Sequence, residues 1–164
     1  MLICILGNLA SGKTTVCYAL NKLLQYKLIV LDEYRIKYNK KCTREGEIKA
    51  QLELIKNLNE KNIILECTGV GRWFTDYLLQ YSLNYPEEEI KKFKLIVPMD
   101  ELYKRVIQRD KSKYKKPPFP YKELKEKTIT ENLLYCNRKL KHVSGIEIPN
   151  LDIEKCVNII KESL

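Results

Sequence analysis

The sequence predicts an α/β fold, specifically a three-layer α/β/α domain built on a parallel five-stranded sheet. Five short apolar runs alternate with segments of helical period, and these runs are continuous, which is typical of parallel strands buried on both faces. At 164 residues the chain is expected to form a single domain, residues 1–164. The predicted strands are Leu2–Leu6, Lys27–Leu31, Asn62–Glu66, Phe93–Val97 and Gly145–Ile148.

Three of the predicted helices carry an apolar stripe at helical spacing. The first helix follows the opening strand, the second begins at about Thr43 and the last begins after Asp152, and both of these residues are favoured N-caps. We expect the stripes to be buried. They consist of Val16, Ala19, Leu20, Leu23 and Leu24 in the first helix, Ile48, Leu52, Ile55 and Leu58 in the second, and Ile153, Val157, Ile160 and Leu164 in the last.

Composition is that of an ordinary globular protein, with 45% hydrophobic and 31% charged residues. The longest apolar runs are far shorter than the roughly 18–20 residues that cross a bilayer, and no secretory signal precedes the first strand. We therefore expect a cytoplasmic protein with no membrane partner. The six cysteines form no C-x-x-C pair, which favours a reducing compartment over a zinc site or a redox dithiol.

The net charge of +9 is concentrated in one segment. Residues 91–127 hold 13 basic and 5 acidic residues, a local excess of +8. Such a field attracts polyanions such as nucleic acid and nucleotides, although a solvated lysine-rich surface has the same pattern. Pro117, Pro118 and Pro120 lie close together in this segment, and we expect a small basic lid over about residues 105–121.

A glycine-rich loop follows the first strand. Its sequence, Gly7-Asn8-Leu9-Ala10-Ser11-Gly12-Lys13-Thr14, matches G-x-x-x-x-G-K-[ST] between a strand and a helix. Backbone N–H groups would hold a triphosphate, Lys13 would bridge its β- and γ-phosphates, and Thr14 would bind Mg²⁺. We therefore expect ATP and Mg²⁺ as cofactors. The predicted nucleotide-binding residues here are Gly7, Asn8, Ala10, Ser11, Gly12, Lys13, Thr14 and Thr15.

The loop leaves open whether the γ-phosphate goes to water or to an acceptor. A GTPase would need a guanine-reading N-K-x-D segment, which the sequence lacks. A motor or AAA-type ATPase would need a second subdomain, for which 164 residues leave little room. Transfer to an acceptor is therefore the favoured reaction class.

Polar residues after the second strand are candidates for the acceptor site. In parallel α/β sheets, ligands bind beyond the carboxyl ends of the strands, so Asp32 and Arg35 are expected to face the glycine-rich loop. If the chain turns helical here, the two side chains lie on the same side. Asp32 would orient the acceptor hydroxyl and take its proton, and Arg35 would hold an anionic group of the acceptor. The alternative is an N-cap Asp beside an exposed Arg.

The third strand ends in Glu66, which is placed to hold Mg²⁺ or its waters. The alternative is a plain strand-end carboxylate. Thr68, two residues further on, is a candidate for an acceptor contact. After the last strand, Asn150 and the two residues before it are candidates for the edge of a purine site.

Two arginines precede the expected lid. Arg105 and Arg109 are four residues apart and share one face of the helix that follows the fourth strand. Two guanidinium groups there would donate to the nucleotide phosphates as charge develops during transfer. The alternative is a pair of solvated arginines that interact with Glu101 or Asp110.

Together, these residues resemble the P-loop kinases, most closely the 5′-hydroxyl polynucleotide kinases. The resemblance rests on GNLASGKT, on DEYR after the second strand, on Glu66, and on ELYKRVIQR before the lid. It implies ATP-dependent transfer to a nucleic acid 5′ end, with Asp32 as general base and Arg35 on the phosphate 3′ of the accepting nucleotide. It also implies Arg109 on the transferring phosphates and Arg105 near the nucleotide.

Two other functions stay open at this point. One is a kinase for small hydroxyl-bearing molecules such as nucleosides or nucleotides. The other is a nucleic-acid-binding module that ATP switches without group transfer. The oligomeric state and the choice between DNA and RNA are also open.

Overall fold

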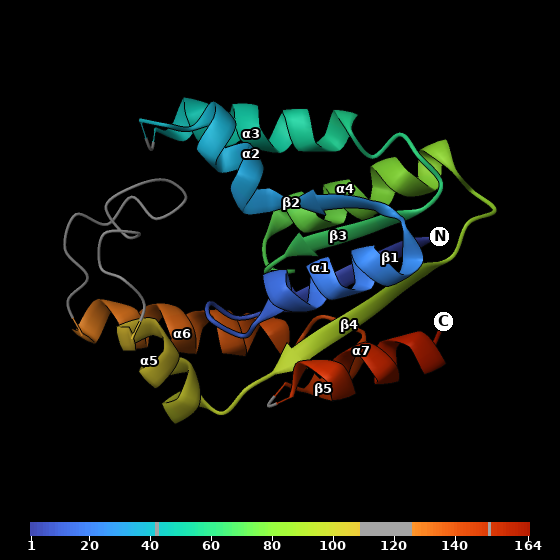
Figure 1. The fold of residues 1–164 in the computed structure, drawn as a ribbon. Coiled ribbons are helices and arrows are strands. Elements are labelled where there is room, and N and C mark those ends of the chain that lie inside the picture. Colours follow the sequence, from blue (N-terminus) through green and yellow to red (C-terminus); the bar gives the residue numbers. More distant parts are fainter. Residues whose placement is uncertain (42, 109–125, 151) are drawn as a thin grey trace.

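The computed structural model describes residues 1–41, 43–108, 126–150 and 152–164 (Figure 1). Parallel strands form one sheet in these residues, and each strand begins and ends within three residues of its predicted position. The strands are β1 (Leu2–Gly7), β2 (Lys27–Val30), β3 (Ile63–Cys67), β4 (Ile90–Ile96) and β5 (Ile146–Pro149). Their order is β2-β3-β1-β4-β5, so the first strand lies at the centre.

The described helices separate these strands as the alternating pattern predicts (Figure 1). They are α1 (Lys13–Leu24), α2 (Leu31–Tyr38), α3 (Arg44–Lys56), α4 (Arg72–Asn84), α5 (Met99–Gln108), α6 (Glu126–Leu140) and α7 (Ile153–Glu162). The predicted N-caps of α3 and α7 are confirmed. The Thr43 side chain accepts a hydrogen bond from the Gly46 N–H at 3.0 Å, and Asp152 accepts one from the Lys155 N–H at 3.2 Å.

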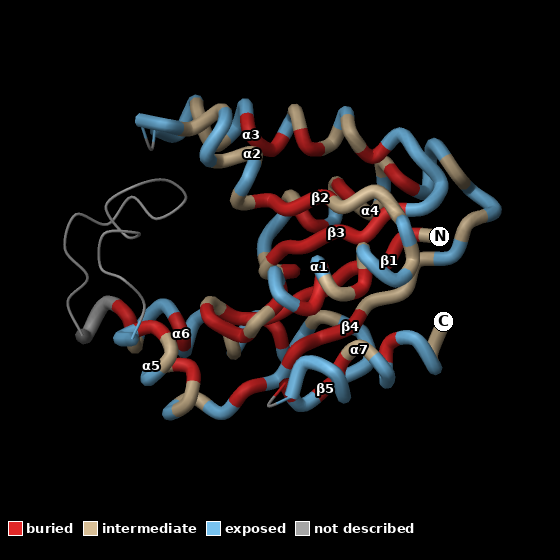
Figure 2. Tube along the Cα trace, viewed as in Figure 1, coloured by how far each residue is buried: buried red, intermediate tan, exposed pale blue. Residues whose placement is uncertain are grey.

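The central strand β1 is buried on both faces (Figure 2). Ile3 and Ile5 pack with α1 and α7, whereas Leu2, Cys4 and Leu6 pack with α3, α4 and α6. Alternate residues of a strand point to opposite faces, so the continuous apolar run fills two separate cores. The predicted three-layer α/β/α architecture is therefore confirmed.

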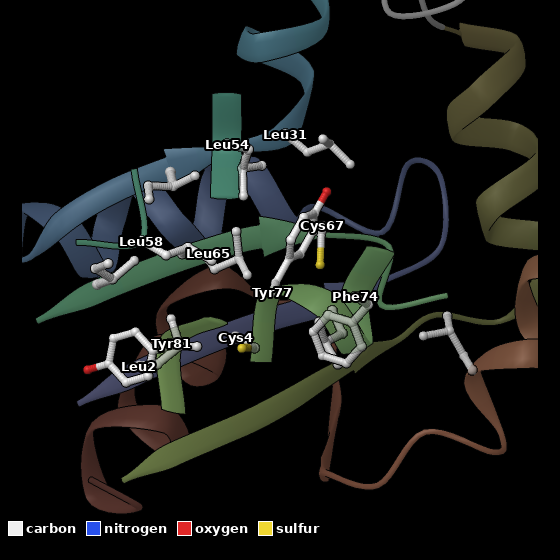
Figure 3. Close-up of a cluster of buried hydrophobic side chains, with 14 of the residues drawn as sticks. Leu2, Cys4, Leu31, Leu54, Leu58, Leu65, Cys67, Phe74, Tyr77 and Tyr81 are labelled. Atoms are coloured by element: carbon white, nitrogen blue, oxygen red, sulfur yellow. The ribbon is translucent and has the colours of Figure 1, made fainter. Parts of the chain in front are cut away.

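The larger core cluster contains two buried tyrosines of α4 (Figure 3). Tyr77 and Tyr81 are at most 1% exposed and are among the largest fully buried side chains. The Tyr81 hydroxyl donates a hydrogen bond to the Lys61 carbonyl. The Tyr77 hydroxyl is buried beside Cys67 and has no hydrogen-bond partner within the described part of the chain.

The predicted buried face of the second helix, α3, is wrong at two of its four positions, whereas Leu58 is fully buried just after the helix and Ile55 packs against the core. Ile48 and Leu52 are 40% and 47% exposed, and the helix packs through Ala50 and Leu54 instead. The buried residues form a second apolar stripe at four-residue spacing, and Glu47 lies one turn before the buried Gln51, where it binds an arginine of α2. Apolar spacing alone contains no information about that contact.

Two other predicted stripes are wrong at single positions. In α1, Leu23 is 50% exposed and Cys17 is buried in its place. In α7, Ile153 is 42% exposed, and the buried residues are Cys156 and Ile160. In both helices a cysteine acts as a small apolar side chain of the core.

The described residues can be searched for disulfides, for clusters of metal ligands and for membrane-spanning helices. The described cysteines, Cys4, Cys17, Cys67, Cys136 and Cys156, are free and buried. Nowhere in the described ranges do three or more His, Cys, Asp or Glu side chains group as potential metal ligands. None of the helices described is both long enough and apolar enough to span a membrane.

Candidate active site

The glycine-rich loop connects β1 to α1 at the carboxyl edge of the sheet. Two of its residues adopt left-handed conformations, Ala10 with φ 61° and Gly12 with φ 85°. Alternation between right- and left-handed residues turns successive backbone N–H groups toward one point and forms an anion-binding concavity. The α1 helix begins directly afterwards at Lys13, so its N-terminal N–H groups face the same point.

The side chain of Asn8, at the start of this loop, forms hydrogen bonds with α6. Its side-chain amide donates to the Leu133 carbonyl at 2.8 Å and to Asn137 Oδ1 at 2.7 Å. Asn137 in turn donates to Met99 Sδ of α5 at 2.9 Å. Asn8 was predicted to bind nucleotide. Because these bonds occupy its side-chain amide, the backbone N–H is the group of Asn8 that would donate to a phosphate.

Asn150 fastens the end of the loop to the turn after β5. Its buried side-chain amide donates to the Ser11 carbonyl, and its Oδ1 accepts from Cys156 Sγ at 3.0 Å. A side chain at Gly12 would collide with this amide, because an added Cβ would lie 2.5 Å from Asn150 Nδ2. The sequence suggested a purine contact here, whereas the structure turns the Asn150 side chain into the loop.

Lys13, Thr14 and Glu66 lie together below the loop. Lys13 Nζ donates to the Asn8 carbonyl at 2.8 Å and lies 3.8 Å from Glu66 Oε1. Thr14 Oγ1 donates to Glu66 Oε2 at 3.3 Å. The structure thus brings together the three residues that the sequence assigned to the phosphates and Mg²⁺, and Glu66 is more than a plain strand-end carboxylate.

Burial controls the protonation of Glu66, which is 4% exposed. Desolvation raises the pKa of Glu66 above its ordinary value, and the negative charge of Asp32 raises it further. The positive charge of Lys13 and the hydrogen bond from Thr14 lower this pKa, without cancelling the effect of burial. A carboxylate held in this way gains most from a cation that neutralises it.

Asp32 and Arg35 form the predicted pair at the start of α2. The helix begins at Leu31, so the two residues lie one turn apart, and Arg35 Nη1 donates to Asp32 Oδ1 at 3.2 Å. Glu47 of α3 binds the other side of the same guanidinium, with Nη2 donating to Oε1 at 2.8 Å and Nε donating to both oxygens at 3.1 Å.

The three charges affect one another's ionisation. Although burial lowers the pKa of Arg35, hydrogen bonds and charge from Glu47 and Asp32 raise it overall. Burial likewise raises the pKa of Glu47, but the hydrogen bonds from Arg35 and Gln51 lower it overall. The sequence reasoning missed Glu47, because the α2–α3 pairing that brings it to Arg35 leaves no periodic pattern.

Arg105 of α5 makes the contact that the alternative interpretation expected. Its Nε donates to Glu101 Oε1 at 2.8 Å, and its Nη2 reaches the Asn150 carbonyl at 3.5 Å. Arg109, like the expected lid beyond residue 108, lies outside the described residues. Thr15 is exposed in the first turn of α1, and Thr68 is half-buried in the loop after β3.

The residues present fit a triphosphate and Mg²⁺. Ser11 Oγ is buried inside the loop and has no hydrogen-bond partner in the part of the chain that is described, as expected for a group that binds phosphate. Thr14 and Glu66 offer a hydroxyl and a carboxylate oxygen 3.3 Å apart, and hard oxygen donors are the ligands that Mg²⁺ prefers.

Comparison with known proteins agrees with this nucleotide-binding framework. A family model described as "AAA domain" matches residues 3–131, a range that starts before the glycine-rich loop and includes β1 to β4. No curated protein matches the sequence.

Solved structures with this fold share little sequence with the chain. Shikimate kinase from Bacteroides thetaiotaomicron has a TM-score of 0.71 at 15% identity, over 99% of this chain and 97% of that one. A sugar kinase from Janibacter sp. has a TM-score of 0.65 at 15% identity, over 98% and 92%. Deoxyadenosine kinase from M. mycoides, with bound dATP, has a TM-score of 0.59 at 18% identity, over 99% and 98%. At these identities the likeness shows a common fold.

Proposed function

We propose that this chain, which belongs to the AAA domain family, is an ATP- and Mg²⁺-dependent kinase that phosphorylates a hydroxyl group of a small molecule. One observation carries the proposal. Lys13, Thr14 and Glu66 converge below the glycine-rich loop, and Asp32 lies near enough for its charge to raise the pKa of Glu66. Residues that bind phosphate, with a second carboxylate nearby, suit the transfer of a phosphoryl group to an alcohol.

In this mechanism the loop and Lys13 hold the triphosphate, and Thr14 and Glu66 hold Mg²⁺, which would neutralise charge on the phosphate oxygens. Asp32 accepts a hydrogen bond from the acceptor hydroxyl and orients it in line with the γ-phosphorus. The acceptor oxygen forms its bond to phosphorus as the bond to the departing ADP oxygen breaks. Asp32 takes the hydroxyl proton late, because the transition state is loose.

A small-molecule acceptor has the support of the proteins with the same fold. These proteins are a shikimate kinase, a sugar kinase and a deoxyadenosine kinase, and each name states a small hydroxyl-bearing substrate. Fold likeness by itself does not transfer a substrate, so these names support a class of acceptor only.

A nucleic acid 5′ end is the second candidate acceptor, favoured by the excess of +8 over residues 91–127. In the described part of that segment, however, several charges are engaged inside the protein. Lys91 and Lys92 donate to the Ser163 carbonyl and to Ser144 Oγ, each at 2.6 Å. Lys94 is 5% exposed and pairs with Glu147 at 2.9 Å. These lysines are therefore poorly placed to contact a phosphate backbone.

The test is phosphoryl transfer from γ-labelled ATP to a panel of sugars, other polyols, nucleosides and a 5′-hydroxyl oligonucleotide. We expect label in at least one small molecule. Label in the oligonucleotide alone would establish the second candidate. ATP binding without transfer to any acceptor would contradict a kinase and favour the ATP-switched binding module.

A further inference from the structure

The guanidinium of Arg35 is already bound by carboxylates from two helices. It contacts Asp32 of α2 at 3.2 Å and Glu47 of α3 at 2.8 Å. A guanidinium has five N–H donors, and Nε, Nη1 and Nη2 of Arg35 each use at least one of them on these two carboxylates. The trio of Asp32, Arg35 and Glu47 therefore has two negative charges and one positive charge, so its net charge is negative.

The trio remains accessible from solution. The side chains of Asp32, Arg35 and Glu47 are 39%, 27% and 32% exposed. Two lysines of the same helices, Lys37 and Lys49, are directed to the ring of Tyr38, with their Nζ atoms 5.1 and 5.7 Å from its centroid. An acceptor that approaches Asp32 thus meets carboxylates and a guanidinium whose charge is already balanced.

We propose, on the basis of the proposed kinase function, that the acceptor is an uncharged polyhydroxy compound, such as a sugar or a nucleoside. Its hydroxyl groups donate to the carboxylates of Asp32 and Glu47, and hydrogen bonds to ionised acceptors are among the stronger ones in proteins. Arg35 is a positioning residue in this scheme. It holds Asp32 Oδ1 and leaves Oδ2 for the reacting hydroxyl.

An anionic acceptor is disfavoured for two reasons. Its carboxylate or phosphate would lie beside Asp32 and Glu47, and like charges at close range repel. To bind it, Arg35 would have to leave Glu47, and a partly buried carboxylate without its partner is costly. This assignment differs from the resemblance-based expectation that Arg35 grips a phosphate of the acceptor.

Paired acceptors test the inference. Each pair has the same ring scaffold with and without an anionic group: a hexose and its uronate, and a nucleoside and its 3′-monophosphate. We expect wild type to favour the uncharged member by about tenfold or more in kcat/KM. The hexose pair and the nucleoside pair show which of the two uncharged classes of acceptor the protein phosphorylates.

Glu47→Gln supplies the decisive comparison, because it frees the guanidinium of Arg35 while keeping the shape of the side chain. We expect it to shift the ratio of kcat/KM toward the anionic member by about tenfold, mainly through a lower KM for that member. Glu53→Gln is the matched control, since Glu53 lies on the same helix and pairs with Lys56 at 2.7 Å. Its ratio should equal that of wild type.

Each ratio is measured within a single variant, so any unfolded fraction cancels. A wild-type preference for the anionic member would overturn the inference and leave the kinase function standing. Equal ratios for Glu47→Gln and Glu53→Gln would do the same. If no acceptor on any scaffold takes up label, the proposed function itself is overturned, and the inference with it.

Discussion

The side-chain amide of Asn150 donates a hydrogen bond to the backbone carbonyl of Ser11, so the turn after β5 holds the phosphate-binding loop from behind. Asn150 is itself fixed, because its N–H donates to the Ile96 carbonyl at 2.9 Å and its Oδ1 accepts from Cys156. Asn8 anchors the other end of the loop to α6. The loop is thus held in its binding shape without a ligand, which lowers the ordering cost of binding.

Asn150→Ala removes one of these anchors. We expect ATP affinity to fall about tenfold, because the loop must then be ordered by the nucleotide, with a loss of about 1–3 kcal/mol in the free energy of unfolding. Titration calorimetry and urea unfolding measure the two quantities. Asn84→Ala is the control, since Asn84 also donates from its amide to a backbone carbonyl, that of Leu58 at 2.9 Å, at a distance from the loop along the chain. Equal ATP affinities in the two variants would contradict an anchoring role.

Asp32→Asn tests the general base. The amide keeps the size of the side chain but cannot take the hydroxyl proton, so we expect kcat to fall about 10²–10⁴-fold while the Kd for ATP changes little. Rapid quench and ATP titration separate the two effects. Glu33→Gln is the neighbouring control, because Glu33 is exposed and binds the Tyr18 hydroxyl at 2.7 Å. A full rate of transfer in Asp32→Asn would remove Asp32 from the mechanism.

Glu66→Gln should change how stability depends on pH. The pKa of Glu66 is raised by burial above its ordinary value of 4.5, so in the window above that value the folded chain holds a proton that the unfolded chain releases. This contribution to stability is present below pH 4.5 and is lost as the pH rises through the raised pKa. The variant lacks it, so we expect the variant to gain stability relative to wild type as the pH rises across that window, in urea unfolding without Mg²⁺.

Glu47→Gln should change the pH dependence of stability in the opposite direction. The pKa of Glu47 is lowered overall by the hydrogen bonds from Arg35, despite the opposing effect of burial. Its stabilising contribution is therefore present above pH 4.5 and is lost as the pH falls through the lowered pKa. The same pH trend in both variants would contradict the assigned directions.

Tyr77→Phe should stabilise the protein. The Tyr77 hydroxyl is buried without a hydrogen-bond partner in the described residues, so its removal ends a desolvation cost of about 1–3 kcal/mol while the ring stays in place. Tyr81→Phe, one turn later on α4, is the matched control that should destabilise, because its hydroxyl is bonded to the Lys61 carbonyl. Thermal and urea unfolding measure both. A destabilised Tyr77→Phe would indicate a partner for this hydroxyl.

Local patterns were sufficient to predict the architecture, because continuous apolar runs and a glycine-rich loop depend on neighbours in sequence. They also predicted the approach of Thr14 to Glu66, since the loop before Thr14 follows β1, Glu66 lies near the end of β3, and these parallel strands end at the same edge of the sheet. Glu47 could not be identified as a site residue, and the contact of Asn150 with the loop could not be predicted, because both depend on contacts made across the fold. Apolar spacing could not choose between Ile48 with Leu52 and Ala50 with Leu54 in α3, because both pairs repeat every four residues.

The anchors of the phosphate-binding loop have a consequence for synthesis. The loop leaves the ribosome early, whereas Leu133, Asn137 and Asn150, which hold it, follow more than a hundred residues later. At about 5–20 residues per second, the nascent chain spends several seconds with this segment exposed and without its supports. Nucleotide in the cell therefore stabilises the chain most strongly once the C-terminal third, which carries these anchors, has been translated.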